Sequence, residues 1–345
     1  MGVALTELLL IKEIEIDALQ NKILAVDASM WLYQFLSSIR QRDGTLLMDS
    51  KGNVTSHLVG LLSRISNLMQ HNVKLAFVFD GEAPLLKKLT LEKRKGIKLE
   101  AQKNLDKAKE DGDEELMKKY ASRTSRLNDE MKEEAKKLVE AFGLPAITAP
   151  SEAEAQASLI VKNGDAYAIA TNDADALLFE APTIIRNVSI AGRKKKTNKL
   201  SYETVNPDMI LLDENLKHLG INQGQLIALA MLIGTDFNMG GIKGIGPKSA
   251  LKLVKKHENN FDAMFNEAKW HDNFEFEWKE VFDLIKHMKV NKDYELKWTN
   301  IDEEKVMNLL VDKHDFSEER VKGQISELLK LKEKKGQKGL GEFFG

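Results

Sequence analysis

The chain has 345 residues, of which 43% are hydrophobic and 30% charged, which is typical of a soluble globular protein with one large core or two smaller ones. It contains no cysteine, so disulfides, zinc–thiolate sites and cysteine nucleophiles are excluded. No apolar run is long enough for a membrane span and the N-terminal segment lacks the basic start of a signal peptide, so we expect an intracellular protein with no membrane contact. The net charge of −2 does not indicate a nucleic-acid partner, although residues 87–98, 193–199 and 243–256 are strongly basic.

The first half of the chain alternates between strand and helix patterns. Buried strands are expected at 22–29, 74–82, 166–175 and 182–190, and helices with apolar periodicity at 29–39 and 56–70. This alternation predicts an α/β fold with a mostly parallel sheet flanked by helices. Ligands of such sheets bind beyond the carboxyl ends of the strands.

The remaining segments read as helical. Residues 83–138 are rich in charge and carry no strand pattern, so we expect exposed helices there, and the next helix should end at Gly143. From about 206 to 332 the pattern is again helical, and from 333 a flexible basic tail is expected.

Acidic residues fall where the apolar elements end or begin. The set consists of Asp27, Asp80, Glu152, Glu154, Asp173, Asp175 and Asp236. For Glu152 and Glu154 there is a local alternative, because Ser151 and Glu154 fit a helix capping box and Glu152 would favour the positive N-terminus of the helix. For these two acids, capping is as good an explanation as chemistry. Glu152 and Glu154 do not share a helical face, which makes Glu154 the better candidate for direct metal ligation.

Seven carboxylates at one rim of a sheet would repel one another unless cations neutralised them. Oxygen-only ligands suit Mg²⁺ or Mn²⁺, and two such ions can hold both the attacking and the leaving oxygen of a phosphodiester displacement. The small residues Ala153, Ala155 and Ala174 would leave room for a nucleotide backbone. The sequence therefore predicts a two-metal site that acts on nucleic acid.

Five motifs in order carry a family resemblance: "AVDAS", "FVFDG", "PSEAEAQA", "TNDADALLF" and "GTDFNMGGIKGIGPKSA". Together they resemble the flap endonuclease family, the structure-specific nucleases of the xeroderma-pigmentosum-G type, and in particular the archaeal members. The resemblance implies that the seven carboxylates bind two divalent ions on a PIN-like sheet. It also implies five regions: an N-terminal nuclease region (1–82), a helical arch (83–138), an internal nuclease region (139–236), a helix-hairpin-helix and C-terminal helical region (237–332), and a tail (333–345).

Two basic residues of the arch are implied to act on the scissile phosphate. Lys87 and Arg94 stand seven and fourteen residues after Asp80, and a spacing of two helical turns would put both on one face. Without the resemblance, two solvated side chains on an exposed helix would be the better interpretation. One departure lies in the "GTDF" motif, where Phe237 replaces the tyrosine that is common in the family.

The resemblance also implies residues that contact DNA. Gly244 and Gly246 belong to a hairpin whose free N–H groups can meet phosphates, often with a monovalent cation bound there. Tyr33 is implied to stack on a template base, although a core aromatic is the plain alternative. The "DFSEERV" segment (315–321) is implied to receive a one-nucleotide 3′ flap together with Thr55, but the lysine common two residues before its Phe is His314 here. The full set is Gly2, Tyr33, Arg40, Thr55, Arg64, Lys243, Gly244, Gly246, Lys248, Lys252, Phe316, Ser317 and Arg320.

The C-terminal "QKGLGEFF" has the spacing of a peptide that binds the sliding clamp PCNA, with Gln337, Leu340, Phe343 and Phe344 as contacts. These expectations combine into a monomeric, Mg²⁺-dependent 5′ flap endonuclease with 5′–3′ exonuclease activity, which acts at Okazaki-fragment and base-excision-repair junctions. The alternatives are a PIN-like ribonuclease and a non-catalytic junction binder recruited by the clamp. A ribonuclease of that kind would lack the hairpin and tail, and a binder could lose acidic residues.

Overall fold

The computed structural model describes residues 4–41, 43–188, 192–195 and 202–341. Its centre is a seven-stranded sheet with the order β1-β9-β6-β5-β2-β3-β4, and a separate two-stranded sheet pairs β7 with β8. The strands are β1 (Lys12–Glu13), β2 (Ile23–Asp27), β3 (Lys74–Phe79), β4 (Ala146–Thr148), β5 (Ala168–Ala170), β6 (Thr183–Arg186), β7 (Gly192–Lys195), β8 (Tyr202–Val205) and β9 (Asp208–Leu211).

The five strands from β6 to β4 run parallel, and β9 joins β6 and β1 antiparallel. The predicted mostly parallel sheet is therefore confirmed, and β2, β3, β5 and β6 all lie within the predicted strand ranges. The prediction of helix from 206 is wrong at its start, because β9 occupies Asp208–Leu211. Its apolar run is too short for periodicity to separate a strand from a helix.

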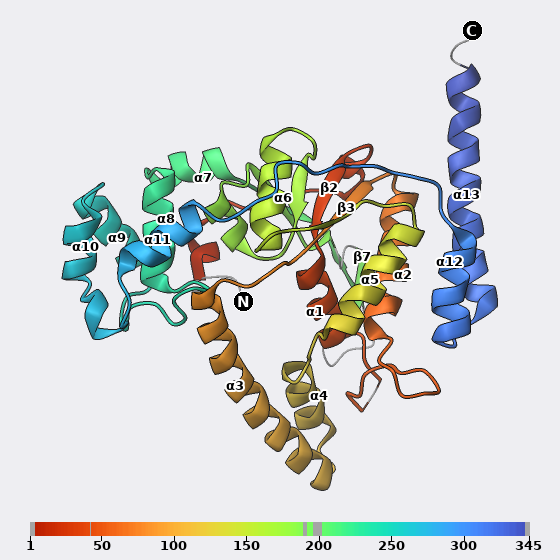
Figure 1. Ribbon diagram of the computed structural model, residues 1–345, viewed down its shortest axis with the longest axis horizontal. Helices are drawn as coiled ribbons and strands as arrows, with labels where there is room; N and C mark the ends of the chain where they lie inside the picture. Colours follow the sequence, from red (N-terminus) through yellow and green to blue (C-terminus); the bar gives the residue numbers. More distant parts are fainter. Residues whose placement is uncertain (1–3, 42, 189–191, 196–201, 342–345) are drawn as a thin grey trace.

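Helices surround the sheet and extend beyond it at both ends (Figure 1). The helices are η1 (Ala4–Leu8), η2 (Ile16–Leu19), α1 (Ala28–Ser38), α2 (Ser56–Gln70), α3 (Leu85–Glu110), α4 (Glu114–Arg123), α5 (Asp129–Ala141), α6 (Ala153–Lys162), η3 (Ala174–Phe179), α7 (Leu212–Leu219), α8 (Gln223–Ile233), α9 (Pro247–His257), α10 (Phe261–Glu267), η5 (Trp270–Asp272), α11 (Trp278–Lys286), α12 (Glu303–Met307), the π-helix η6 (Asn308–Lys313) and α13 (Glu318–Gly341). None of the helices within the described ranges combines the length and apolar character needed to cross a bilayer.

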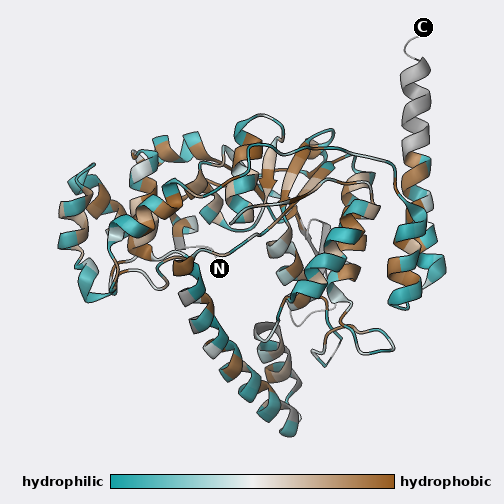
Figure 2. Cartoon of the chain, in the orientation of Figure 1, coloured by the Kyte–Doolittle hydropathy of each residue, from teal (hydrophilic) through white to brown (hydrophobic). Residues whose placement is uncertain are grey.

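Each face of the sheet has its own core. Side chains alternate along β2, so Leu24 and Val26 pack in the cluster that includes α1, α2 and α5, whereas Ala25 packs with α6, η3 and α8. Figure 2 shows the apolar strands enclosed between these helices. Contact between α1 and α2 is close, since a Cβ at Gly60 would lie 2.2 Å from the ring of Phe35.

The charged excursion consists of two helices, α3 and α4, which pack on each other through Ala101, Leu105, Ala108 and Ala121 and project from the body (Figure 1). Most of their residues are hydrophilic (Figure 2). The next helix, α5, begins within the range predicted for the excursion, but its buried residues belong to the main core. As predicted, α5 ends just before Gly143, which has a φ of 72°.

The C-terminal segment differs from its prediction. A flexible tail was expected from 333, but α13 continues to Gly341. Val321, Ile325 and Leu328 anchor the first turns of α13 in the core. The following residues include Leu and several Lys, which favour helix, as well as Gly336, Gly339 and Gly341, and the helix extends through them away from the body (Figure 1).

Candidate active site

Three neighbouring strands bring acidic residues to one edge of the sheet. Asp27 ends β2, Asp80 follows β3, and Asp173 follows β5, and these strands are adjacent in the order β5-β2-β3. The chain adds β3 and β4 on one side of β2 and then β5 on the other side, so the strand order switches between β5 and β2. Parallel sheets open a crevice for ligands at such a switch point. The first three carboxylates therefore meet because of the topology.

Asp80 also fixes the start of α6. Its Oδ1 accepts a hydrogen bond from the backbone N–H of Ala153 at 2.8 Å. Glu152 is the N-cap residue but its side chain makes no capping bond, and the hydroxyl of Ser151 donates to the carbonyl of Glu82. The capping-box explanation is therefore wrong, and the carboxylates of Glu152 and Glu154 are left for other interactions.

Close backbone approach allows this arrangement. A Cβ at Gly81 would lie 2.0 Å from the carbonyl oxygen of Ala149, so only glycine fits between β3 and the segment that leads into α6. The N–H of Gly81 donates to the carbonyl of Ser151 at 2.7 Å. Together with the Asp80 cap, this contact places α6 at the end of β3.

Two carboxylates at the centre of the cluster are buried among others. Burial, and then the charge of Asp80, raise the pKa of Asp27 to about 7 despite a hydrogen bond that its Oδ1 accepts from the N–H of Met30 at 3.0 Å. Burial also raises the pKa of Glu154 well above its usual value, and the charges of Asp173, Asp27 and Asp175 add to this effect. Burial is the larger cause of both shifts, and the neighbouring carboxylates add to it.

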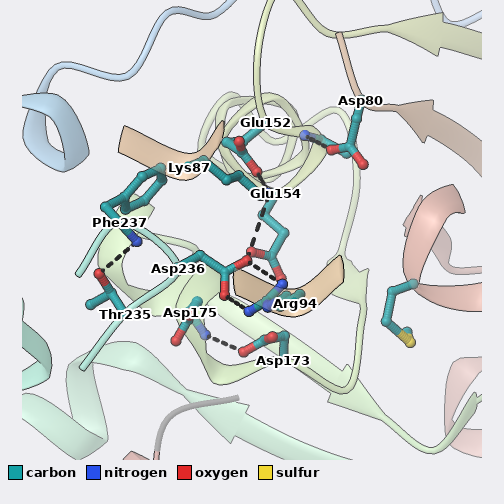
Figure 3. A network of polar contacts seen from close by, with 12 residues as sticks. Asp80, Lys87, Arg94, Glu152, Glu154, Asp173, Asp175, Thr235, Asp236 and Phe237 are labelled. Atoms are coloured by element: carbon teal, nitrogen blue, oxygen red, sulfur yellow. Dashed lines mark hydrogen bonds and ion pairs between the residues drawn. The ribbon is translucent and has the colours of Figure 1, made fainter. Parts of the chain in front are cut away.

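Two arch cations enter the cluster (Figure 3). Lys87 on α3 forms an ion pair with Glu152 and lies 3.7 Å from Asp236, and Arg94, two turns later, pairs with Asp236. Burial alone would lower the pKa of Lys87, but Glu152, Asp80 and Asp236 outweigh burial and raise it. Both basic side chains are therefore charged and largely withdrawn from solvent.

The donor set fits hard divalent cations. Besides the carboxylates, the set includes the hydroxyl of Thr171, which lies 3.4 Å from Oε1 of Glu154. Oxygen ligands of this kind suit Mg²⁺ or Mn²⁺. Across the described ranges, no three His, Asp or Glu side chains are already drawn together as ligands of one ion. Glu152 and Asp236 are instead paired with Lys87 and Arg94, and a divalent ion would relieve the repulsion around Glu154.

Comparisons with known proteins agree with this geometry. The family models for the XPG N-terminal domain and the XPG I-region match residues 2–101 and 143–236. Flap endonuclease 1 of Hyperthermus butylicus is 46% identical over 96% of this chain and 95% of its own length, and that of Thermococcus onnurineus is 46% identical over 100% and 99%. The chain belongs to the flap endonuclease family. The structure of flap endonuclease-1 from Methanococcus jannaschii superposes with a TM-score of 0.74 at 36% identity, covering 97% of this chain and 100% of that one.

The predictions of an archaeal-type flap endonuclease and of its α/β fold are therefore confirmed. The structure shows where most of the predicted site residues lie. In this flap endonuclease Asp236 follows α8, and the turn after it is held by Asn238, whose Oδ1 accepts from the hydroxyl of Thr235 at 2.6 Å. Phe237 is buried behind Asp236.

Tyr33 is not a core residue. It is 41% exposed, whereas Trp31 and Phe35 on the same helix are buried. Lys98 of the arch lies 5.2 Å above the Tyr33 ring in a cation–π contact. The arch thus touches the flap endonuclease body at the aromatic residue that was predicted to stack on a base.

Three further predicted DNA contacts are partly or wholly covered. Arg40 donates to the carbonyl of Gly44 and the hydroxyl of Ser125, both at 2.8 Å. Thr55 is buried at the N-cap of α2, and Arg64 on α2 is half-buried. Direct contact with DNA would require at least Thr55 to become accessible.

The hairpin between α8 and α9 presents basic side chains to solvent. Gly244 has a φ of 86°, a conformation that favours glycine, and Gly246 caps α9. Lys243, Lys248 and Lys252 are all exposed. They do not share the carboxylate cluster and form a separate basic surface at the start of α9.

The residues predicted to meet a 3′ flap lie at the start of α13. Ser317 and Arg320 are exposed, and Phe316 is half-buried against the core. Gln337 and Leu340 fall within α13, whereas Gly2, Phe343 and Phe344 lie outside the described residues.

Sequence reasoning missed two contacts of the site. Thr171 contacts Glu154, and its hydroxyl accepts from the N–H of Asp173 at 3.2 Å. Its position between the end of β5 and the "NDAD" segment could have indicated this role. The contact of Lys98 with Tyr33 joins residues 65 positions apart, and nothing local in the sequence indicates it.

Proposed function

We propose that the protein is a structure-specific 5′ flap DNA endonuclease that also removes nucleotides 5′–3′ at nicks and gaps. Its place would be at Okazaki-fragment junctions and in base-excision repair. The observation that carries the proposal is the carboxylate cluster at the ends of β5, β2 and β3, with two cations of the arch buried in it. A phosphodiester drawn into that cluster would meet groups able to stabilise every charge that the hydrolysis develops.

The proposed metal ligands are Asp27, Asp80, Glu152, Glu154, Asp173, Asp175 and Asp236, which would hold two Mg²⁺ or Mn²⁺ ions, directly or through water. When bound, the ions supply the positive charge that stabilises the attacking and leaving oxygens. Asp80 has a second task, because it orients α6 before any ion arrives, and Thr171, which is not a proposed ligand, orients Glu154.

Lys87 and Arg94 would each release a carboxylate partner and bind the scissile phosphate instead. Both are already desolvated and charged, so little reorganisation is needed when a phosphate oxygen replaces Glu152 or Asp236 as their partner. Arginine can bind the phosphate in a forked geometry and lysine as a point charge. Because both side chains belong to α3, their positions depend on how the arch sits on the body.

Duplex DNA would be held at a distance from the chemistry. The exposed lysines at the start of α9 suit sequence-independent phosphate contacts, with a monovalent cation at the Gly244–Gly246 turn. Tyr33 would stack on the template base at the junction once Lys98 leaves its ring. On this proposal the arch comprises α3 and α4, since α5 belongs to the main core.

The C-terminal residues from Gln337 would bind the sliding clamp PCNA. A helical turn would place Leu340 beside the aromatic pair Phe343 and Phe344, which suits an apolar groove on a partner. The enzyme itself would act as a monomer that the clamp tethers to the junction.

The full chain should be incubated with labelled 5′ flap, nicked, single-stranded DNA and single-stranded RNA substrates, each with Mg²⁺ and with EDTA. We expect cleavage of the flap one nucleotide inside the duplex, slower removal of nucleotides at the nick, and no product in EDTA. Preferential cleavage of RNA would support the PIN-like ribonuclease instead. Tight flap binding without cleavage at any Mg²⁺ or Mn²⁺ concentration would contradict an enzymatic role.

A further inference from the structure

A buried polar network lies behind the residues proposed to receive a 3′ flap. The ring of His314, with its side chain 1% exposed, has Nδ1 2.9 Å from Oδ2 of Asp49 and Nε2 2.9 Å from Oε1 of Glu134. Glu134 on α5 also pairs with Lys313 and lies 3.5 Å from the ring of His57 on α2. The network therefore joins α2, α5, the loop that contains Asp49 and the turn before α13.

Both partners of His314 are ionised acceptors. Burial would raise the pKa of Glu134, but hydrogen bonds from His57, Lys313 and His314 outweigh it and lower the pKa to about 2. Hydrogen bonds from Asn53 and His314 likewise outweigh burial and lower the pKa of Asp49. Both ring nitrogens of His314 therefore face carboxylate oxygens, which can only accept. Burial lowers the pKa of the neighbouring His57.

The segment that Asp49 belongs to is a short hairpin, residues 48–54, closed by a bridge between Met48 and Val54. This 48–54 hairpin leads directly into Thr55 at the N-cap of α2. It docks on the turn before α13, where the N–H of Ser50 donates to Oδ2 of Asp315 at 2.8 Å. His314 provides the buried part of the same junction.

The backbone around His314 departs from regular helix. It follows the π-helix η6, and the next residue, Asp315, has a φ of 58°, which non-glycine residues seldom adopt. This geometry turns the chain so that Phe316 lies against the core while Ser317 and Arg320 face solvent. Such a conformation persists only where surrounding contacts hold it, and His314 makes two of those contacts.

We propose that His314 is a positioning residue that fixes the two walls of the 3′-flap site, the 48–54 hairpin with Thr55 and the segment from Asp315 to Arg320. The proposal rests on the function proposed above and extends it to the choice of substrate. His314 is too deeply buried to touch DNA, so it acts through Asp49 and Glu134. It determines how strongly the enzyme prefers a junction that carries one unpaired 3′ nucleotide.

The test compares two 5′ flap substrates that differ only in one unpaired 3′ nucleotide. We expect His314→Gln to reduce the preference for the 3′-flap substrate about tenfold, mainly through KM, which corresponds to loss of one charge-assisted contact. The rate on the substrate without the 3′ nucleotide should change far less. His314→Lys should restore the preference, because an ammonium can donate to both carboxylates. The matched control is His71→Gln, which removes an exposed contact with Asp17 at the other end of α2.

If His314→Gln does not fold, Asp49→Asn provides the second variant, since it removes only the carboxylate on the hairpin side. A preference that survives in whichever of these variants folds would overturn the inference, and so would an equal loss on both substrates, which would indicate a merely structural role. Failure of the unmodified enzyme to cleave either substrate would instead contradict the proposed function.

Discussion

Replacing Asp27 by Asn should stabilise the metal-free protein at neutral and alkaline pH. Asparagine keeps an oxygen that can accept from the N–H of Met30, so the cap of α1 is preserved while the charge is removed. The charge is unfavourable where it lies, because burial and the neighbouring Asp80 raise the pKa of Asp27 from its ordinary 3.8 to about 7. The difference of roughly three pKa units corresponds to about 4 kcal/mol at 1.36 kcal/mol per unit.

The sign follows from proton binding. Between pH 4 and 7 the unfolded chain has lost the proton of Asp27 while the folded chain still binds it, so the free energy of unfolding falls as the pH rises through this window. Above about pH 7 both states are ionised and the full penalty is present. The advantage of Asp27→Asn should therefore grow by about 4 kcal/mol between pH 4 and pH 8 and then remain constant.

Urea unfolding in EDTA at pH 5, 6, 7 and 8 would measure this advantage. Asp113→Asn is the matched control, because Asp113 caps α4 in the same way but lies in the arch, away from the cluster. Addition of Mg²⁺ at pH 8 should stabilise the unmodified protein more than the variant. An advantage of Asp27→Asn that is the same at pH 5 and pH 8 would refute the argument from repulsion.

The other predictions concern cleavage. Asp80→Ala and Asp175→Ala should each abolish cleavage in single-turnover assays while flap binding, measured by fluorescence anisotropy, stays nearly intact; near-normal turnover in both would reject the metal assignment. Lys87→Ala should lower kcat about 100-fold with little loss of affinity. Lys88→Ala is the control: it loses only an exposed pair with Glu82 and should change neither kcat nor affinity. Equal losses of rate and affinity in Lys87→Ala would count against the role of Lys87. Removal of residues 337–345 should leave intrinsic cleavage unchanged and eliminate stimulation by the clamp, and stimulation that persists would place clamp binding elsewhere.

The central sheet could be predicted because its signals are local. Each of β2, β3, β5 and β6 is an apolar run, and β2, β3 and β5 end at an acid or are followed by one within a few residues at the active edge. Three strands of the central sheet escaped prediction: β1 (Lys12–Glu13), β4 (Ala146–Thr148) and β9 (Asp208–Leu211). They are strands because a neighbour is available to pair with, and this depends on the tertiary fold rather than on their own residues.

The sequence could predict which residues meet at the candidate site, but not which of their side chains pair with one another. Parallel strands end at one edge, so the sequence could bring Asp27, Asp80 and Asp173 together without coordinates. Helical periodicity could also have placed Tyr33 opposite Trp31 and Phe35, which lie four residues apart on the buried face. Contacts such as that of His314 with Asp49 join positions 265 residues apart, and only the folded chain shows them.

The pairing of the arch with the cluster has a thermodynamic consequence. Glu152 and Asp236 are partners of Lys87 and Arg94 and are also proposed ligands of the divalent ions, so each set of cations weakens the attraction of these carboxylates for the other. A phosphate that draws Lys87 and Arg94 away would release both carboxylates and thereby increase metal affinity. By reciprocity, bound metal would favour the arch position in which its cations face the phosphate. Substrate binding and metal occupancy would then reinforce each other, which confines full assembly of the site to DNA that can bring a phosphate beneath α3.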